Sequence, residues 1–246
     1  MKVFFHDDFY QVYTSEPAAE QGRMESIVKA ISPIVSFKQA IPALIDDIEL
    51  AHTQKHIAEV KSEGLYDIAA LAAGATIQAA KTGLTEPSFA LVRPPGHHAS
   101  SDSCWGFCYF SNMAIAMLLL KNEGLIQTAL VLDIDLHFGD GTANILDPHG
   151  WVKVYNPPER KREKYMQNTE KLLSEIDVDI IGISAGFDHH VDDWGKMLET
   201  DDYFSIAKMV KAAAKKSGGG YFAVLEGGYN HAVLGQNARA LIEGMM

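Results

Sequence analysis

Polar residues follow four apolar segments of this chain where each segment ends, and this arrangement constrains the fold more than any other feature. The segments that we expect to be strands are Phe89–Val92, Thr128–Leu136, Asp179–Ser184 and Tyr221–Leu225. The polar runs that end or follow them are Arg93–His98, Asp133–His137, Ser184–Asp188 and Glu226–Tyr229. Open parallel α/β sheets bind ligands at the carboxyl ends of their strands, so four such ends predict one shared site.

Predicted helices alternate with these strands along the whole chain. Two further strands are expected at Lys2–Phe5 and Val152–Tyr155, and helices at Ala18–Ile31, Gln54–Ser62, Tyr66–Thr82, Asn112–Asn122, Arg162–Ile176, Asp202–Lys216 and His231–Gly244. This alternation is typical of an α/β protein with helices on both faces of a mostly parallel central sheet, a three-layer α/β/α sandwich. No linker or change of composition divides residues 1–246, which we interpret as one domain.

The net charge and the lengths of the apolar runs narrow the classes of partner that this chain could bind. The formal net charge of -11 argues against nucleic-acid binding, which needs clustered basic residues, and suits cationic small molecules or basic peptides. Cys104 and Cys108 lack a second pair at zinc-finger spacing, so we interpret them as reduced thiols. The apolar run Met113–Leu120 is too short for a membrane span, and acidic residues follow the N-terminal apolar run. We therefore expect a soluble, cytoplasmic protein.

The segment around Asp133 gives the strongest chemical signal. Side chains of a strand alternate between faces, so Asp133, Asp135 and His137 share one face, and Phe138 takes the apolar face. Two carboxylates this close repel one another, and removing them from water is costly unless a cation compensates. The spacing therefore favours a metal ion. The alternatives are a buried hydrogen-bonded network or a strand end that reaches water.

Asp188 adds a third donor to this pattern. It follows an apolar strand through the small residues Ala185 and Gly186, which let the backbone bend inward. Asp135, His137 and Asp188 then offer one imidazole and two carboxylates. Three protein ligands with one open position are typical of a catalytic zinc site. Fe(II) and Co(II) accept similar donors, so the ligand set leaves the metal open.

Two histidines and a tyrosine are candidates for the remaining chemistry. His97 and His98 follow a stiff Pro-Pro-Gly turn, and either could move a proton beside an activated water. Asp133 and Asp140 are candidate carboxylate partners for the two rings. Tyr229 follows two glycines and could donate a hydrogen bond to a developing oxyanion. The alternatives are packed or exposed histidines and a tyrosine that covers the core.

Five motifs in order resemble the histone deacetylase and acetylpolyamine amidohydrolase family: RPPGHH, GFCYFSN, DIDLHFGDG, SAGFD and LEGGYN. The resemblance covers nearly the whole chain. It implies the arginase/deacetylase fold and hydrolysis of an acylated amine by metal-activated water, with release of acetate and free amine. It implies zinc on Asp135, His137 and Asp188. It also implies that His98 is the general base and acid, with His97 as its electrostatic partner.

The resemblance assigns further roles around these residues. Asp133 would orient His97, and Asp140 would orient His98. Tyr229 would polarise the substrate carbonyl, and Gly106 and Phe107 would line an acyl-lysine channel. The family also binds a monovalent cation such as K⁺, which here would lie near the Asp133 side chain and the main-chain carbonyls of Asp135 and His137. The side-chain hydroxyl that usually completes that site is not found after Val154.

The sequence departs from the family pattern at several places. Phe138 stands where the family motif D-x-D-x-H-H-G has a second histidine, and we expect this change not to affect zinc because of the predicted alternation. The connection between Val154 and Ser184 is short, and Asn156–Pro158 leads almost directly into a helix. The family's second channel-lining aromatic is therefore missing. The loop before Tyr66 is also short. We expect a shallow channel, or one completed by another subunit of a homo-oligomer.

The prediction is an active deacetylase acting on a small acylated amine or an acyl-lysine peptide. Acetylpolyamines, acetyl-lysine and longer acyl-lysines all remain open as substrates. Two other functions were weighed. One is a non-catalytic module that holds acylated amines in the zinc pocket. The other is an arginase-like hydrolase with two metal ions, in which His98 would have to become a ligand.

Overall fold

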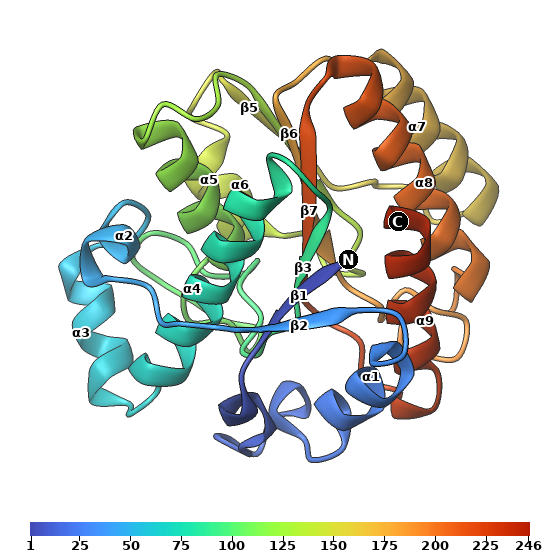
Figure 1. Ribbon diagram of the computed structural model, residues 1–246. Coiled ribbons are helices and arrows are strands. Elements are labelled where there is room, and N and C mark those ends of the chain that lie inside the picture. Colours follow the sequence, from blue (N-terminus) through green and yellow to red (C-terminus); the bar gives the residue numbers. More distant parts are fainter.

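A seven-stranded parallel sheet forms the centre of the computed structural model, which describes residues 1–246 (Figure 1). The strands are β1 (Lys2–Phe5), β2 (Ser36–Gln39), β3 (Ser88–Ala90), β4 (Ala129–Asp133), β5 (Val152–Tyr155), β6 (Ile180–Ala185) and β7 (Gly220–Leu225). Their order across the sheet is β2-β1-β3-β7-β6-β4-β5, and every neighbouring pair is parallel. The predicted parallel sheet is confirmed.

Helices cover both faces of the sheet and complete the predicted three-layer sandwich (Figure 1). On one side α4 (Tyr66–Gly83) packs on α5 (Asn112–Asn122), which contacts α6 (Asp140–Leu146). The short α2 (Ile45–Glu49) and α3 (Gln54–Ser62) lie beside this group. On the other side α8 (Thr200–Ser217) contacts α7 (Arg162–Glu175) and α9 (His231–Met245), and α1 (Arg23–Ile31) packs on α9. None of these helices combines the length and apolar character that crossing a membrane would require.

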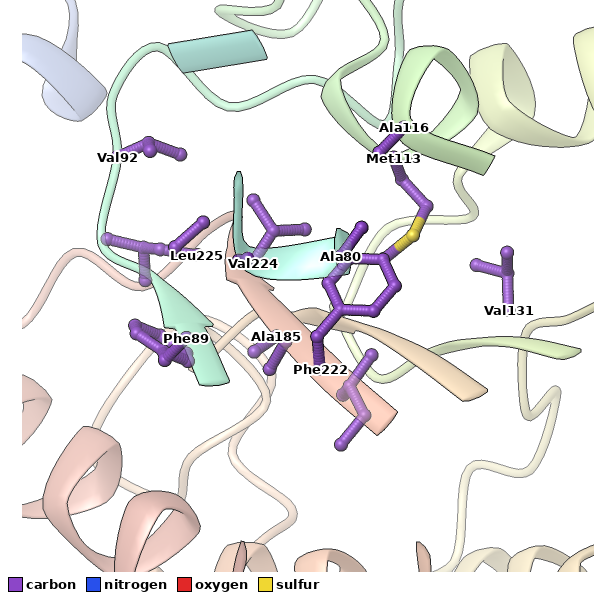
Figure 2. Close-up of a cluster of buried hydrophobic side chains, with 14 of the residues drawn as sticks. Ala80, Phe89, Val92, Met113, Ala116, Val131, Ala185, Phe222, Val224 and Leu225 are labelled. Carbon is purple, nitrogen blue, oxygen red and sulfur yellow. The ribbon is translucent and has the colours of Figure 1, made fainter. Parts of the chain in front are cut away.

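The apolar core forms one cluster of 68 buried residues on both faces of the sheet. All residues of β6 and β7 are buried, as expected for parallel strands that are covered on both sides. Figure 2 shows part of this core, with Ala80 of α4, Met113 of α5 and Phe222 of β7 among the residues drawn. The central strands are therefore held rigidly, and their carboxyl ends provide a fixed platform for polar side chains.

The strand predicted over Thr128–Leu136 is too long, because β4 ends at Asp133. The main-chain N–H of Asp135 donates to Asp133 Oδ1 at 3.1 Å, and that of His137 donates to Asp135 Oδ1 at 2.9 Å. Aspartate side chains that bond the backbone two residues on replace strand pairing with turns. The expectation that Phe138 faces the apolar side is therefore wrong: its side chain is 61% exposed.

Other differences concern short or exposed elements. The strand β2 was not predicted, because its four residues are all exposed and show no alternation of burial. The helices α2 and α6 were not predicted either, because they are too short to show helical periodicity. The first helix begins at Arg23 rather than Ala18, after Gly22 in a left-handed conformation with φ of 90°.

Candidate metal centre and active site

Four adjacent strands deliver the predicted site residues to one edge of the sheet. β3, β7, β6 and β4 are consecutive in the sheet order. His97 and His98 follow β3, Tyr229 follows β7, and Asp188 follows β6. Asp133 ends β4, and Asp135 and His137 come directly after it. The predicted convergence of polar strand ends is therefore what the fold produces.

Asp135, His137 and Asp188 form a compact donor set. Their ligand atoms lie within 4.8 Å of one another. His137 Nδ1 is 3.3 Å from Asp135 Oδ1 and 3.1 Å from Asp188 Oδ2. Asp188 is fully buried; its Oδ1 accepts the main-chain N–H of Leu136 at 3.0 Å, and its Oδ2 has no partner other than the His137 ring nitrogen. Burial, together with the negative charge of Asp135, raises the pKa of Asp188 to about 7.

A divalent cation fits this donor set. An enclosed carboxylate oxygen without a partner is costly, and a second carboxylate beside it adds repulsion. A metal ion at this point would satisfy the Asp188 oxygen and neutralise both charges. One imidazole and two carboxylates suit zinc, and also iron or cobalt in the divalent state.

Small residues bring these ligands close together. The main-chain N–H of Gly227 donates to Asp135 Oδ2 at 2.8 Å. A Cβ atom on Gly186 would overlap the same carboxylate and come within 2.5 Å of the Asp135 Cα. The small-residue turn predicted after the Asp179–Ser184 strand thus lets the Asp188 segment pack directly on Asp135.

His97 lies buried between two carboxylates. Its Nδ1 is 3.0 Å from Asp133 Oδ2, and its Nε2 is 3.7 Å from Asp135 Oδ1. Although burial opposes the charged form, the charges of Asp135 and Asp133 hold the pKa of His97 well above its usual range. His97 is therefore a fixed positive group at the back of the site, as expected of an electrostatic partner.

His98 forms the second His–Asp pair, and its ring lies near that of His137. Its Nδ1 is 2.6 Å from Asp140 Oδ1, and its ring centroid is 6.0 Å from that of His137. Burial and the charge of His97 lower the pKa of His98 to about 4, so the ring is neutral at pH 7. A Cβ atom on Gly106 would overlap this ring, so the glycine lets the GFC segment cover it.

The sequence analysis missed Trp105 as a site residue. Its indole ring lies over the His98 ring, with centroids 3.8 Å apart and planes 31° apart. Its Nε1–H donates to Asp140 Oδ2 at 2.9 Å. Although burial opposes ionisation, the bonds from His98 and Trp105 hold the pKa of Asp140 below its usual range. A tryptophan directly before the GFC motif was the only signal available in the sequence.

Tyr229 lies at the mouth of the site among aromatic rings. It stacks on Trp194 with centroids 4.0 Å apart and contacts Phe107 edge to face at 5.9 Å. Its main-chain N–H donates to Asp193 Oδ2 at 2.8 Å, which fixes the turn. Burial and the charge of Asp135 raise the pKa of Tyr229, so the phenol keeps its proton. The structure thus places Phe107 beside Tyr229 and Gly106 over His98.

Two buried charged residues behind the site were also missed. Glu226 Oε2 accepts the main-chain N–H groups of Gly96 at 2.7 Å and His97 at 3.2 Å. Arg23 donates to the carbonyls of Glu226 at 2.6 Å and Gly228 at 2.8 Å. These bonds tie the histidine turn to the tyrosine turn. A glutamate directly after an apolar strand was the available signal.

A second group of ligand atoms within 4.8 Å of one another comprises His97, Cys108 and Glu226. It does not fit a metal ion well. His97 Nδ1 faces Asp133, and Glu226 Oε2 accepts two main-chain bonds. Burial raises the pKa of the Cys108 thiol well above its usual range, so the thiol is protonated. His98, which an arginase-like second metal would need as a ligand, belongs to neither group.

The Asp133 side chain predicted at the monovalent cation site is already engaged. Its Oδ1 accepts from the Asp135 main chain, and its Oδ2 faces His97. Binding of K⁺ near Asp133 and the carbonyls of Asp135 and His137 stays a prediction.

A cavity of about 680 Å³ opens beside the metal ligands. It is lined by Asp135, Leu136, His137, Phe138, Asn156, Pro157, Pro158, Glu159, Arg160, His189, Gly195, Lys196 and Met197. The short connection between β5 and α7 forms one wall, and α7 begins at Arg162 as the sequence indicated. The connection between β5 and α7 is too short to fill this cavity.

Comparison with known proteins agrees with this geometry. A family model described as the histone deacetylase domain matches residues 59–156 and 149–245. The chain belongs to the histone deacetylase family. It is 32% identical to a protein named probable deacetylase from Archaeoglobus fulgidus, with 89% of this chain and 74% of the relative covered.

Further relatives of this deacetylase family member carry related names. It is 27% identical to the histone deacetylase-like amidohydrolase of Pseudomonas aeruginosa, over 93% of this chain and 76% of the relative. It is 30% identical to polyamine deacetylase HDAC10 of Mus musculus, over 74% of this chain and 34% of the relative. The crystal structure of the HDA15 HD domain superposes with a TM-score of 0.85 at 22% identity, covering 99% and 88% of the two chains. That likeness establishes the arginase/deacetylase-like fold.

Proposed function

We propose that this protein is a zinc-dependent deacetylase that hydrolyses the amide of an acylated amine, releasing acetate and the free amine. The observation that carries the proposal is the cluster of two buried carboxylates and one imidazole, in which Asp188 Oδ2 has no partner other than the His137 ring at 3.1 Å. His97, His98 and Tyr229 follow neighbouring strands to the same edge of the sheet. The amine half is acetyl-lysine or a small acetylated amine, in keeping with the deacetylase names of its relatives.

Each side chain has a distinct part in the proposed reaction. Neutral His98, held through Nδ1 by Asp140, can accept a proton from the attacking water at Nε2 and return it to the leaving nitrogen. The Tyr229 phenol can donate a hydrogen bond to the carbonyl oxygen as negative charge develops there. Positively charged His97 stabilises the same charge. Zinc, when bound, supplies Lewis acidity that polarises the carbonyl and lowers the pKa of water.

The proposal is tested with zinc-loaded and metal-stripped protein on acetyl-lysine peptides and acetylpolyamines. Hydrolysis should require the metal, and Fe²⁺ or Co²⁺ should be tried in place of zinc. Tyr229→Phe and His98→Ala should each lower kcat by about 100-fold or more, as is typical for loss of a proton-transfer or oxyanion group. Far-UV circular dichroism should show an unchanged fold.

Two outcomes would contradict the proposal. Tight binding of acylated amines by the zinc-loaded protein without any turnover would indicate the binding module instead. Two metal ions per chain, with loss of one in His98→Ala, would indicate the arginase-like hydrolase.

A further inference from the structure

The cavity beside the metal ligands extends the candidate site in one direction. It shares Asp135 and His137 with the metal centre but does not include His98 or Tyr229. Its volume of about 680 Å³ lies within the range of small-molecule sites in proteins. A substrate whose amide lies at the metal centre would therefore extend one end into this cavity.

The amine half of the substrate is the end that reaches the cavity. Another side of the site is formed by His97, Cys108 and Glu226, which are all buried. That enclosed side suits a small acyl group. The cavity instead opens toward solvent, because Phe138, Arg160 and Lys196 on its wall are exposed. The larger amine half requires such an opening.

Two unpaired cations face this cavity. Arg160 and Lys196 line it, and neither has a carboxylate within the 4.0 Å of an ion pair, whereas the neighbouring Arg162 is bound to Asp202 at 2.6 Å. Glu159 also lines the cavity, but one of its oxygens accepts from Asn168 and the other is enclosed. The exposed charged side chains on the wall are therefore the two cations, whereas Asp135 is buried and Glu159 is half-buried.

The local charge outweighs the acidic character of the whole chain. The net charge of -11 is spread over the surface, and salt screens it beyond about 8 Å at physiological ionic strength. The two cations would contact a ligand directly. A cationic polyamine would be repelled by them, and a carboxylate would be attracted.

We propose that the cavity binds a carboxylate carried by the amine half of the substrate. The favoured substrates are then acylated amino acids such as free Nε-acetyl-lysine, or chains that end in an acyl-lysine, rather than acylpolyamines. This inference rests on the proposed deacetylase function and specifies its substrate class.

The test compares matched substrates of the zinc-loaded protein. Free Nε-acetyl-lysine should have a kcat/KM at least about fivefold above that of Nε-acetyl-lysinamide, which lacks the negative charge, since each exposed ion pair contributes up to about fivefold. N-Acetylputrescine should be poorer still. Arg160→Gln and Lys196→Asn should each lower the ratio of kcat/KM for the carboxylate substrate to kcat/KM for the amide. Asparagine is chosen because Lys196 has a φ of 50°, which asparagine tolerates.

Lys164→Gln is the matched control, because Lys164 is an exposed cation on the same helix as Arg162 and does not line the cavity. Equal rates on the two lysine substrates would overturn the inference. Preference for Nε-succinyl-lysinamide would also overturn it, because the carboxylate would then lie on the acyl half.

A binding measurement separates failure of this inference from failure of the deacetylase proposal. Calorimetry of the zinc-loaded protein with the same two lysine ligands reports the preference without turnover. Preferential binding of the carboxylate, if it is abolished when Arg160→Gln and Lys196→Asn are combined, supports the inference even where no substrate is hydrolysed. Equal binding contradicts it.

Discussion

The indole N–H of Trp105 donates to Asp140 Oδ2 at 2.9 Å, while the other oxygen of that carboxylate lies 2.6 Å from His98 Nδ1. Both oxygens of Asp140 are therefore engaged by groups that also touch each other, because the indole lies over the His98 ring. Trp105 thus fixes both the carboxylate and the imidazole. Since the tryptophan is 54% exposed, the contact depends on local packing rather than on burial in the core.

Trp105 is expected to act as a positioning residue. Trp105→Phe keeps a ring over His98 but loses the hydrogen bond to Asp140, and it should lower kcat about fivefold with less than a twofold change in KM. Trp105→Leu loses both contacts and should lower kcat further. Steady-state kinetics on an acetyl-lysine substrate checks this. Full activity of both variants would show that His98 needs no support from the indole.

Zinc is expected to stabilise the protein through Asp188. At a zinc concentration of about 100 times Kd, binding should add about 2.7 kcal/mol. For a chain of this length, that gain should raise Tm by about 5–10 °C. Asp188→Asn should abolish the zinc-induced rise. It should change Tm of the metal-free protein little, because it removes both the repulsion from Asp135 and the pairing with His137. Thermal unfolding followed by fluorescence measures both effects. An undiminished zinc response in the variant would place the metal elsewhere.

Gly186→Ala is expected to damage the metal centre. The added methyl group would overlap the Asp135 carboxylate and lie 2.5 Å from the Asp135 Cα, so the chain must shift. We expect zinc affinity to fall more than tenfold, with a loss of about 2 kcal/mol of folding stability, as is typical of overpacking. Gly150→Ala is the control, because nothing lies within 4 Å of its Cβ position. Competition with a chromogenic chelator gives the affinities, and equal affinities of the two variants would disprove the expectation.

His52 predicts a pH dependence of stability that is independent of the metal centre. The ring is buried, and its Nε2 accepts the main-chain N–H of Ser111 at 2.9 Å. Burial and the charge of His56 lower the pKa of His52 from 6.5 to about 3. Below pH 6.5, His52 is protonated in the unfolded chain but stays neutral in the folded protein. The folded protein therefore becomes less stable as the pH is lowered toward 3.

The His52 contribution should approach 1.4 kcal/mol per pH unit below pH 6.5. Between pH 7 and pH 5 the protein should lose about 1–2 kcal/mol more than His52→Gln, which can still accept a hydrogen bond from Ser111 but cannot titrate. Urea unfolding at the two pH values measures the difference. Equal losses of stability in the original protein and in His52→Gln would mean that His52 takes up its proton in the folded state.

The sequence was sufficient for the strand–helix alternation and for the residues at the strand ends. Apolar runs such as Ile180–Ala185 are buried on both faces, so their hydrophobicity alone marks them as central strands. Polar residues that come directly after such runs can only lie at the sheet edge. For that reason Asp188 could be grouped with Asp135 and His137 before any coordinates were known.

The local path of the chain after Asp133 could not be read in the same way. The sequence predicted a strand as far as Leu136, but main-chain N–H groups donate hydrogen bonds to aspartate oxygens and the strand ends three residues earlier, at Asp133. Those bonds depend on side-chain rotamers and on the neighbouring strand, which periodicity does not describe. The same holds for Trp105, whose contact with Asp140 joins segments 35 residues apart.

The amino-acid sequence by itself determined the layered parallel fold and the set of donor residues, because burial and strand ends follow from the pattern of apolar and polar residues. Only the tertiary structure decided that Asp188 Oδ2 is enclosed beside Asp135 and His137, that Trp105 bonds Asp140, and that Arg160 and Lys196 share one cavity. These relationships arise from packing between segments that are far apart in the sequence. The energy of such contacts depends on the distances between side chains, which the residue types alone do not give.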